Sequence, residues 1–198
     1  MLLCLQCSPG GYRENPCKYV NKFTEKPRTR YITDAEYLAV IDQANSLLHA
    51  AMEISYCCAA RQGDVLQIRR QDLRDEGLYI KQNKTGKEQI KRWTPRLRKA
   101  IDLALNQQGD IKSAIWIFIN QNSTNNTIGK RTFYSWFIQA KKKAQAANPR
   151  MKFDFTFHDI KAKSISDYEG NKQDFSGHLN PAQVATYDRK IKVVDSHE

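Results

Sequence analysis

The sequence predicts an α+β domain that is mainly α-helical and carries a small antiparallel β-sheet. Two observations lead to this fold class. Apolar residues recur at helical spacing in several separate segments, whereas residues 77–93 contain two strand-like runs around a turn. The chain has 198 residues, of which 40% are hydrophobic. This composition is enough to bury the core of one domain and excludes a chain that is disordered throughout.

The helices of the N-terminal half are predicted from capping and periodicity. Thr33 and Glu36 have the spacing of a capping box, and Leu38 and Ile41 follow at helical positions. A second and more apolar helix is predicted over about residues 47–60.

The middle of the chain predicts a hairpin followed by core segments. Residues 77–81 and 89–93 are the two expected strands, because residues 83–87 between them are typical of a turn. We expect this hairpin to lie at the edge of the sheet. A helix is predicted over 95–105, and the apolar segment 115–119 is expected to be a buried strand or another core segment.

The C-terminal part predicts two more helices. Thr132 is expected to cap a helix that ends at the lysines 141–143, since cations suit the C-terminal end of a helix dipole. Asn180 followed by Pro181 predicts the start of a short helix that runs through Tyr187.

The charge balance favours a polyanionic partner. Lys and Arg number 32 against 21 Asp and Glu, which gives a net charge of +11. Such an excess attracts DNA or RNA, although a basic surface can also serve solubility alone. RNA binding would need exposed aromatic side chains for base stacking. Tyr79, Trp93 and Trp136 lie in amphipathic runs, which predicts that they belong to the core instead.

The cysteines and the apolar runs bear on metals and membranes. Cys4, Cys7 and Cys17 could begin a zinc site, but no fourth Cys or His follows at the usual spacing. We therefore expect no metal and no cofactor, and free thiols in a reducing cell. Cys57 and Cys58 lie in an apolar run and are expected to be buried. No apolar run approaches the roughly 20 residues that span a bilayer, so no membrane partner and a cytoplasmic location are predicted.

Six polar residues form an ordered set, and the set is more informative than any one of its members. Each has an ordinary structural explanation, such as a capping cation, a solvated lysine or a core tyrosine. The set consists of Arg61 after the apolar helix, Lys84 in the hairpin turn, His158-x-x-Lys161, Gly177-His178, and Tyr187. This ordered set resembles the catalytic domain of the tyrosine recombinases, the phage integrase family. The resemblance covers roughly residues 25–190.

The resemblance implies how a phosphate would be held and attacked. Arg61 would bind the scissile phosphate, with Asp64 orienting it, and His178 would donate a hydrogen bond to a phosphate oxygen. Tyr187 would be the nucleophile that forms a 3′-phosphotyrosine. Fixed donors aimed at the phosphate oxygens supply most of the acceleration in such a reaction. A covalent intermediate also conserves the bond energy, so no nucleotide cofactor is needed.

The resemblance also implies which groups move protons. Lys84 would protonate the leaving 5′-oxygen, with Lys87 as the second choice, and His158 would assist proton transfer. An alkoxide leaving group needs a proton, and a lysine made acidic by neighbouring cations can provide it.

Two features depart from the family pattern. The family usually has Arg where this chain has Lys161, and a lysine keeps the charge but loses the planar fork that binds phosphate twice. Lys163 is not in register to replace it. The interval from Lys161 to His178 is also short, and Ser164 to Ser176 has little apolar periodicity. The helix before Gly177 is therefore expected to be trimmed, which could displace His178.

The domain organisation follows from the same resemblance. Residues 1–24 are interpreted as a linker or a remnant of a missing N-terminal DNA-binding domain, and residues 25–198 as the catalytic domain. The tail, residues 188–198, contains a few apolar positions. These are equally consistent with packing onto a neighbouring protomer and with a frayed chain end.

The leading hypothesis is a site-specific DNA recombinase of a prophage or other mobile element. It would act on double-stranded DNA as a homo-oligomer and take no small-molecule substrate. A topoisomerase-like activity would use the same chemistry without strand exchange. The alternative from another class is a non-catalytic, truncated DNA-binding relic of an integrase.

Overall fold

The computed structural model describes residues 28–108, 115–119, 128–191 and 196. Its elements in chain order are α1 (Asp34–Ile41), α2 (Ser46–Cys58), α3 (Gln62–Leu66), the 3-10 turn η1 (Arg70–Asp72), β1 (Gly77–Lys81), β2 (Glu88–Arg92), α4 (Pro95–Asn106), α5 (Lys130–Ala147), α6 (Phe157–Asp167), α7 (Lys172–Ser176) and α8 (Pro181–Tyr187). The predicted fold class, helical with a small antiparallel sheet, is confirmed.

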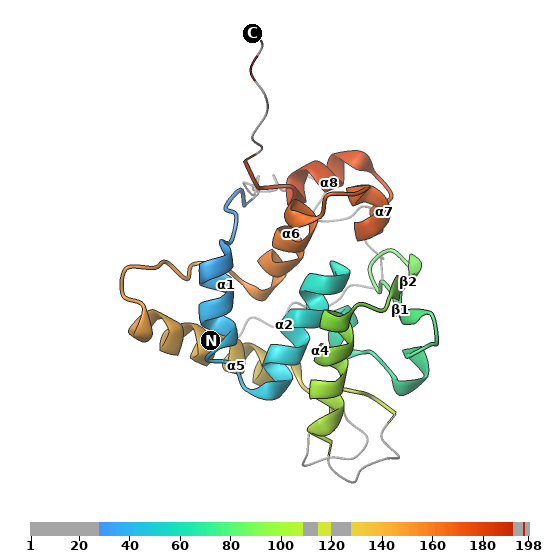
Figure 1. The fold of residues 1–198 in the computed structure, drawn as a ribbon, viewed down its shortest axis with the longest axis horizontal. Helices are drawn as coiled ribbons and strands as arrows, with labels where there is room; N and C mark the ends of the chain where they lie inside the picture. Colours follow the sequence, from blue (N-terminus) through green and yellow to red (C-terminus); the bar gives the residue numbers. More distant parts are fainter. Residues whose placement is uncertain (1–27, 109–114, 120–127, 192–195, 197–198) are drawn as a thin grey trace, which may run out of the picture.

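Helix α2 forms the centre of the domain. Its sequence is apolar on nearly every side, and Leu48, Met52 and Ile54 are fully buried. A helix of this kind needs neighbours all round. The helices α4 and α6 pack against it, α1 and α5 lie on one side, and the hairpin lies on the other (Figure 1). The helices α6, α7 and α8 follow one another at one end of the molecule.

The predicted N-terminal caps of α1 and α8 are confirmed. The Glu36 backbone N–H donates to Thr33 Oγ1 at 3.3 Å, and the Thr33 N–H donates to the Glu36 carboxylate at 2.9 Å. At α8 the Asn180 side chain accepts from the N–H of Ala182 at 2.8 Å, with Pro181 in the first turn.

Three predictions about single elements were wrong. Helix α5 begins at Lys130 with Gly129 as its cap, before Thr132, and continues to Ala147. The lysines 141–143 therefore lie inside the helix and not at its end. The hairpin does not border a larger sheet within the described residues, because β1 and β2 pair only with each other, Gly77 opposite Arg92.

The segment 115–119 is a core segment and not a full strand. It makes an isolated bridge between Trp116 and Arg69, and it buries Ile117 and Phe118 completely.

The aromatic side chains divide between core and surface. Trp93 and Trp136 are half-buried against the core, as predicted. Tyr79 is not part of the core, contrary to the prediction. It is half-buried, and Cζ of Arg74 lies 4.1 Å from the centre of its ring. Since β1 belongs to a two-stranded sheet, one of its faces stays near solvent.

Of the adjacent cysteines, Cys58 is buried as predicted and Cys57 is half-buried. Burial raises the pKa of the Cys57 thiol to about 11 and that of Cys58 further. Cys4, Cys7 and Cys17, like the predicted remnant 1–24, lie outside the described residues. Among the helices that the structure describes, none is long and apolar enough to cross a membrane.

Candidate active site

Arg61 is presented by a tight turn after α2. Helix α2 ends because Ala59 takes a left-handed conformation, with φ of 50°. The Ser55 hydroxyl donates to the Ala60 carbonyl at 2.9 Å and closes the turn. A non-glycine residue in this conformation costs about 1 kcal/mol or more. Arg61 then follows as the N-cap of α3, with its side chain 17% exposed.

The partners of Arg61 differ in part from the predicted ones. Its Nη1 donates to Gln82 Oε1 at 2.9 Å, whereas Asp64 Oδ2 lies at 3.9 Å. Asp64 is buried, and its other oxygen accepts from the Asn83 N–H at 3.0 Å. Gln82 is therefore the closest partner of the guanidinium, and Asp64 supports it as a looser ion pair.

Lys84 and Lys87 lie in the loop between β1 and β2. Both are exposed, and Gly86 between them has a φ of 68°, which the return of the chain requires. The charge of Lys84 lowers the pKa values of Lys161 and His178. Lys84 therefore acts on the site electrostatically.

Helix α6 carries His158 and Lys161 three residues apart and so on one face. Lys161 is only 1% exposed, and its Nζ has no hydrogen-bond partner in the described parts of the chain. Burial, with the nearby charge of Arg61, lowers the pKa of Lys161 to about 7. Lys163 lies on another face and pairs with Asp34 and Asp167, as its register predicts.

His178 lies within the site although α7 is short. The helix α7 spans five residues and ends at Gly177, which has a φ of 66°. His178 is 5% exposed; its Nδ1 lies 2.7 Å from Ser176 Oγ, and its Nε2 is buried without a partner among the described residues. Burial, with the charges of Lys161 and Arg61, lowers the pKa of His178 to about 4. Despite the short interval, the ring of His178 lies beside that of Tyr187.

Tyr187 ends α8 and faces both histidines. Its hydroxyl lies 3.0 Å from His158 Nε2, and its ring centroid lies 4.9 Å from that of His178. The Nζ of Lys161 lies 5.7 Å from the centre of the same ring. Burial and the charge of Lys161 lower the pKa of His158, so this imidazole is largely neutral at pH 7.

The chain just after Tyr187 is tied to α6. The Ser166 hydroxyl donates to the Tyr187 carbonyl at 3.0 Å and accepts from the Arg189 N–H at 2.7 Å. Arg189 also forms a buried ion pair with Asp159 at 2.7 Å. These bonds hold the tyrosine against the residues of its own chain. Of the predicted tail, Ile191 is 92% exposed and residues 192–195 lie outside the described ranges.

The structure thus brings together Arg61, His158, Lys161, His178 and Tyr187, with Lys84 at the exposed rim. Sequence reasoning missed three residues that hold this cluster together: Gln82, Ser176 and Arg189. Gln82 stands two residues before Lys84, but a glutamine at a strand end has no distinctive pattern. Only the contacts between distant segments reveal it.

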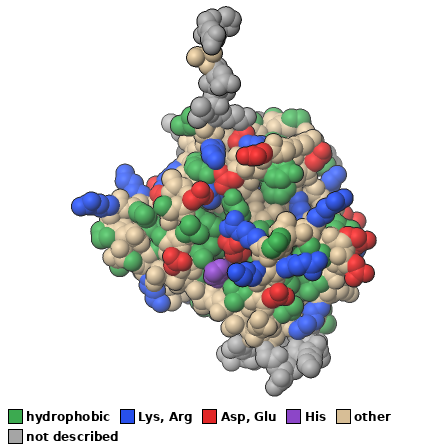
Figure 2. Space-filling model, viewed as in Figure 1, with side chains coloured by type: hydrophobic (Ala, Val, Ile, Leu, Met, Phe, Trp, Pro, Cys, Tyr) green, Lys and Arg blue, Asp and Glu red, His purple; other side chains and the backbone are tan. Residues whose placement is uncertain are grey.

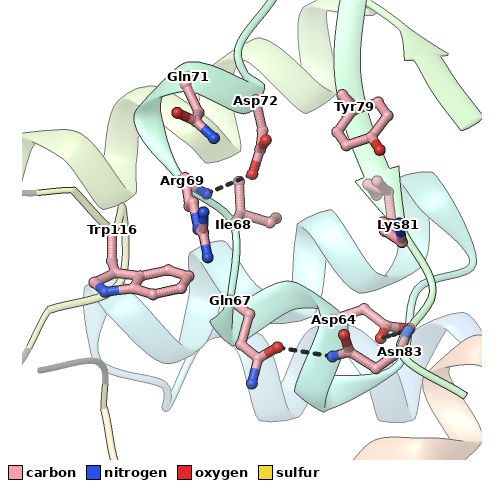
Figure 3. A pocket seen from close by; sticks show the side chains of 11 residues that line it. Asp64, Gln67, Ile68, Arg69, Gln71, Asp72, Tyr79, Lys81, Asn83 and Trp116 are labelled. Carbon is pink, nitrogen blue, oxygen red and sulfur yellow. Dashed lines mark hydrogen bonds between the residues drawn. The ribbon is translucent and has the colours of Figure 1, made fainter. Parts of the chain in front are cut away.

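A separate hollow lies on the far side of Asp64, between α3, η1 and β1 (Figure 3). Its wall includes Arg69, which stacks on Trp116 at 4.7 Å, and the Gln67 amide oxygen, which accepts from Asn83 at 2.8 Å. Among the described residues that line it, none is one of the six predicted site residues.

On the face drawn in Figure 2, Lys and Arg side chains are interspersed with Asp and Glu side chains.

The fold is that of the tyrosine recombinase catalytic domain. A lambda integrase dimer bound to a COC′ core site matches with a TM-score of 0.67 and 22% identity, over 89% of this chain and 65% of that chain. XerA recombinase matches with a TM-score of 0.67 and 16% identity, over 84% and 61%. The Tn1549 transposon integrase in complex with circular intermediate DNA matches with a TM-score of 0.64 and 15% identity, over 91% and 68%.

This chain belongs to the phage integrase family, whose sequence model matches residues 30–192. The predicted family resemblance is thereby confirmed. The chain spans less than two thirds of the length of the lambda integrase and XerA chains that it matches. A comparison with curated proteins gave no match.

Proposed function

We propose that this domain cleaves and rejoins double-stranded DNA in site-specific recombination, through a covalent 3′-phosphotyrosine at Tyr187. One observation carries the proposal. Lys161 Nζ and His178 Nε2 are buried polar atoms without a partner in the described residues, and the charge of Arg61 acts on both. Buried polar groups are normally hydrogen-bonded. Two unpaired hydrogen-bond donors beside a guanidinium are suited to bind the oxygens of a phosphate.

The chemistry is assigned as follows. The Tyr187 oxygen attacks the phosphorus and gives its proton to His158, whose Nε2 lies 3.0 Å away. The bond from phosphorus to the 5′-oxygen breaks, and Lys84 protonates that oxygen. Arg61, Lys161 and His178 would stabilise the charge that develops on the non-bridging oxygens. Rejoining runs the same steps backwards, with a 5′-hydroxyl as the attacking group.

The choice of partner rests on the site and on the solved relatives. Those relatives include lambda integrase dimers bound to DNA and a tetramer bound to a Holliday junction. We propose that this chain likewise acts on double-stranded DNA as a homo-oligomer, and so in the cytoplasm. Its net charge of +11 favours the same partner.

The experiment uses nicked suicide duplexes with a randomised core, incubated with the protein at low salt. A denaturing gel detects covalent adducts, and sequencing of the trapped DNA identifies the site. We expect an adduct that is lost in Tyr187→Phe and kept in Tyr134→Phe, since Tyr134 is an exposed tyrosine on α5. An adduct that survives Tyr187→Phe would contradict the assignment of the nucleophile.

A second candidate function is DNA binding without catalysis, and the state of Lys161 favours it. A lysine with a pKa of about 7 carries only part of the charge of an arginine. This candidate predicts salt-sensitive DNA binding and no adduct, either in the natural chain or in Lys161→Arg. Cleavage restored by Lys161→Arg would instead identify a recombinase disabled at that position.

A further inference from the structure

The neutral imidazole of His178 has two forms, and only one suits a phosphate. The pKa of about 4 means that the ring carries one proton at pH 7, on Nδ1 or on Nε2. With the proton on Nε2, the open nitrogen is a donor. With the proton on Nδ1, the open nitrogen presents a lone pair, which repels a phosphate oxygen. The group that binds Nδ1 therefore decides whether Nε2 donates or accepts a hydrogen bond.

Ser176 is the group that contacts Nδ1. Its hydroxyl oxygen lies 2.7 Å from Nδ1 and 3.4 Å from the carbonyl oxygen of Gln173. A hydroxyl has one proton to donate, and if Gln173 received it, Ser176 would accept from a protonated Nδ1. The length of 2.7 Å is typical of an O–H donor and short for an N–H donor, and the contact with Gln173 is long, so we assign the hydroxyl proton to Nδ1. Donation to Nδ1 leaves the histidine proton on Nε2.

Gln82 holds Ser176 in place and links it to Arg61. The Gln82 side-chain NH2 donates to the Ser176 carbonyl at 2.8 Å, and its Oε1 accepts from Arg61 at 2.9 Å. The direction of this amide is unambiguous, because a guanidinium only donates and a carbonyl only accepts. Gln82 is 5% exposed and Ser176 is 1% exposed, so water does not compete for these bonds.

Gly177 fits the same arrangement. A Cβ at this position would lie 2.6 Å from Gln82 Nε2, so a side chain there would displace the amide. The positive φ of Gly177 favours glycine by itself, and the absence of a Cβ leaves room for the Gln82 amide.

We propose that Ser176 is a positioning residue that holds His178 in the Nε2–H form, and that Gln82 couples this serine to Arg61. The proposal rests on the proposed function, since it explains how two phosphate-binding groups from distant segments are aligned together. Neither Ser176 nor Gln82 would touch the DNA.

The first test reads the tautomer directly, without catalysis. Nitrogen-15 NMR of the full chain at pH 7 should show His178 protonated on Nε2, with Nδ1 accepting a hydrogen bond. In Ser176→Ala the Nδ1 resonance should move as that bond is lost, and in the matched buried serine variant Ser164→Ala it should not. A wild-type ring protonated on Nδ1 would overturn the proposal, whatever the activity of the protein.

The second test measures cleavage and DNA binding separately. Ser176→Ala should slow adduct formation about tenfold, the value of one neutral hydrogen bond, while the dissociation constant for DNA changes by less than about twofold. An unchanged cleavage rate would overturn the positioning role. If the wild-type chain forms no adduct, the proposed function fails, and the NMR result alone decides the assignment of Ser176.

Gln82→Glu provides a second variant should Ser176→Ala fold poorly. It has the same size but places a carboxylate against the Ser176 carbonyl, so the His178 signals should move in the same direction. Gln89→Glu is its control, because Gln89 also donates to a backbone carbonyl near Gly177, that of Asp174, whereas its side chain is not the one that bonds Ser176 and Arg61. Equal shifts in both variants would remove the specific role of Gln82.

Discussion

The hydroxyl of Tyr187 lies 3.0 Å from Nε2 of His158, which comes 29 residues earlier in the chain. The imidazole is largely neutral at pH 7, because burial and the charge of Lys161 lower its pKa. The pair therefore places a phenol within hydrogen-bond distance of a neutral imidazole, which can take the phenol proton when its Nε2 carries none.

The first prediction concerns this pair. His158→Ala should slow formation of the DNA adduct about 100-fold, since it removes a general base. The loss should become smaller as the pH rises, because hydroxide can then take the proton that His158 no longer accepts. Rates measured in single-turnover cleavage from pH 6 to 10 provide the check. A loss that does not change with pH would mean that His158 positions Tyr187 and does not accept its proton.

The second prediction concerns Lys161. Its pKa of about 7 lies below its ordinary value of 10.5, so above pH 7 the free protein holds it largely neutral. A bound phosphate favours the charged form, so binding takes up a proton, and DNA affinity should fall as the pH rises above about 7. The fall is limited to about tenfold per pH unit for one proton.

The charged or titratable groups around Lys161 are Arg61, Asp64, Lys84, Lys91, His158, His178 and Tyr187. Fluorescence anisotropy with one duplex from pH 6 to 9 measures the fall. Lys161→Arg is always protonated, so this variant should lose the dependence near pH 7. A variant with the same pH profile as the natural chain would assign the proton to another group.

The third prediction concerns the tether behind Tyr187. Arg189 and Asp159 are 8% and 4% exposed, so Arg189→Ala leaves a buried carboxylate with its other partners only. We expect a loss of about 3 kcal/mol in the free energy of unfolding. Lys190→Ala is the control, because the pair from Lys190 to Asp167 is longer at 3.6 Å and more exposed, and it should cost less than about 1 kcal/mol. Equal losses in urea denaturation would contradict the tether.

The same ion pair makes stability depend on pH. Burial alone would raise the pKa of Asp159, but the hydrogen bonds from Arg189 and Thr156 outweigh it and lower the pKa. The stabilisation is therefore present above the ordinary pKa of an aspartate and is lost as the pH falls through the lowered value. Arg189→Ala should reduce this acid dependence.

The fourth prediction compares two glycines. Gly177→Ala should lower the free energy of unfolding by more than about 1 kcal/mol, because φ is 66° and the new Cβ would meet Gln82. Gly63→Ala should be neutral or raise it by up to about 1 kcal/mol, since Gly63 lies in α3 with open space around it. Chemical denaturation of both variants measures the difference.

Local chemistry determined a large part of the fold. The capping residues Thr33 and Asn180, the apolar face of each helix and the turn at Gly86 act over a few residues, so their pattern is visible in the sequence. The start of α5 was missed because Gly129 satisfies the first helical turn without a capping side chain. The order and spacing of Arg61, Lys84 and the C-terminal motifs are also visible in the sequence, and they identified the family.

Only the tertiary structure decided the state of the site. The lowered pKa of Lys161, the open nitrogen of His178 and the bonds of Gln82 depend on which groups from α3, the hairpin, α6 and α7 exclude water from one another. Burial and Coulomb interactions act through space, and the bond from Gln82 to Ser176 joins residues 94 positions apart in the chain. The sequence by itself determined which chemical groups this protein carries, and packing determined their protonation, their partners and their common direction towards Tyr187.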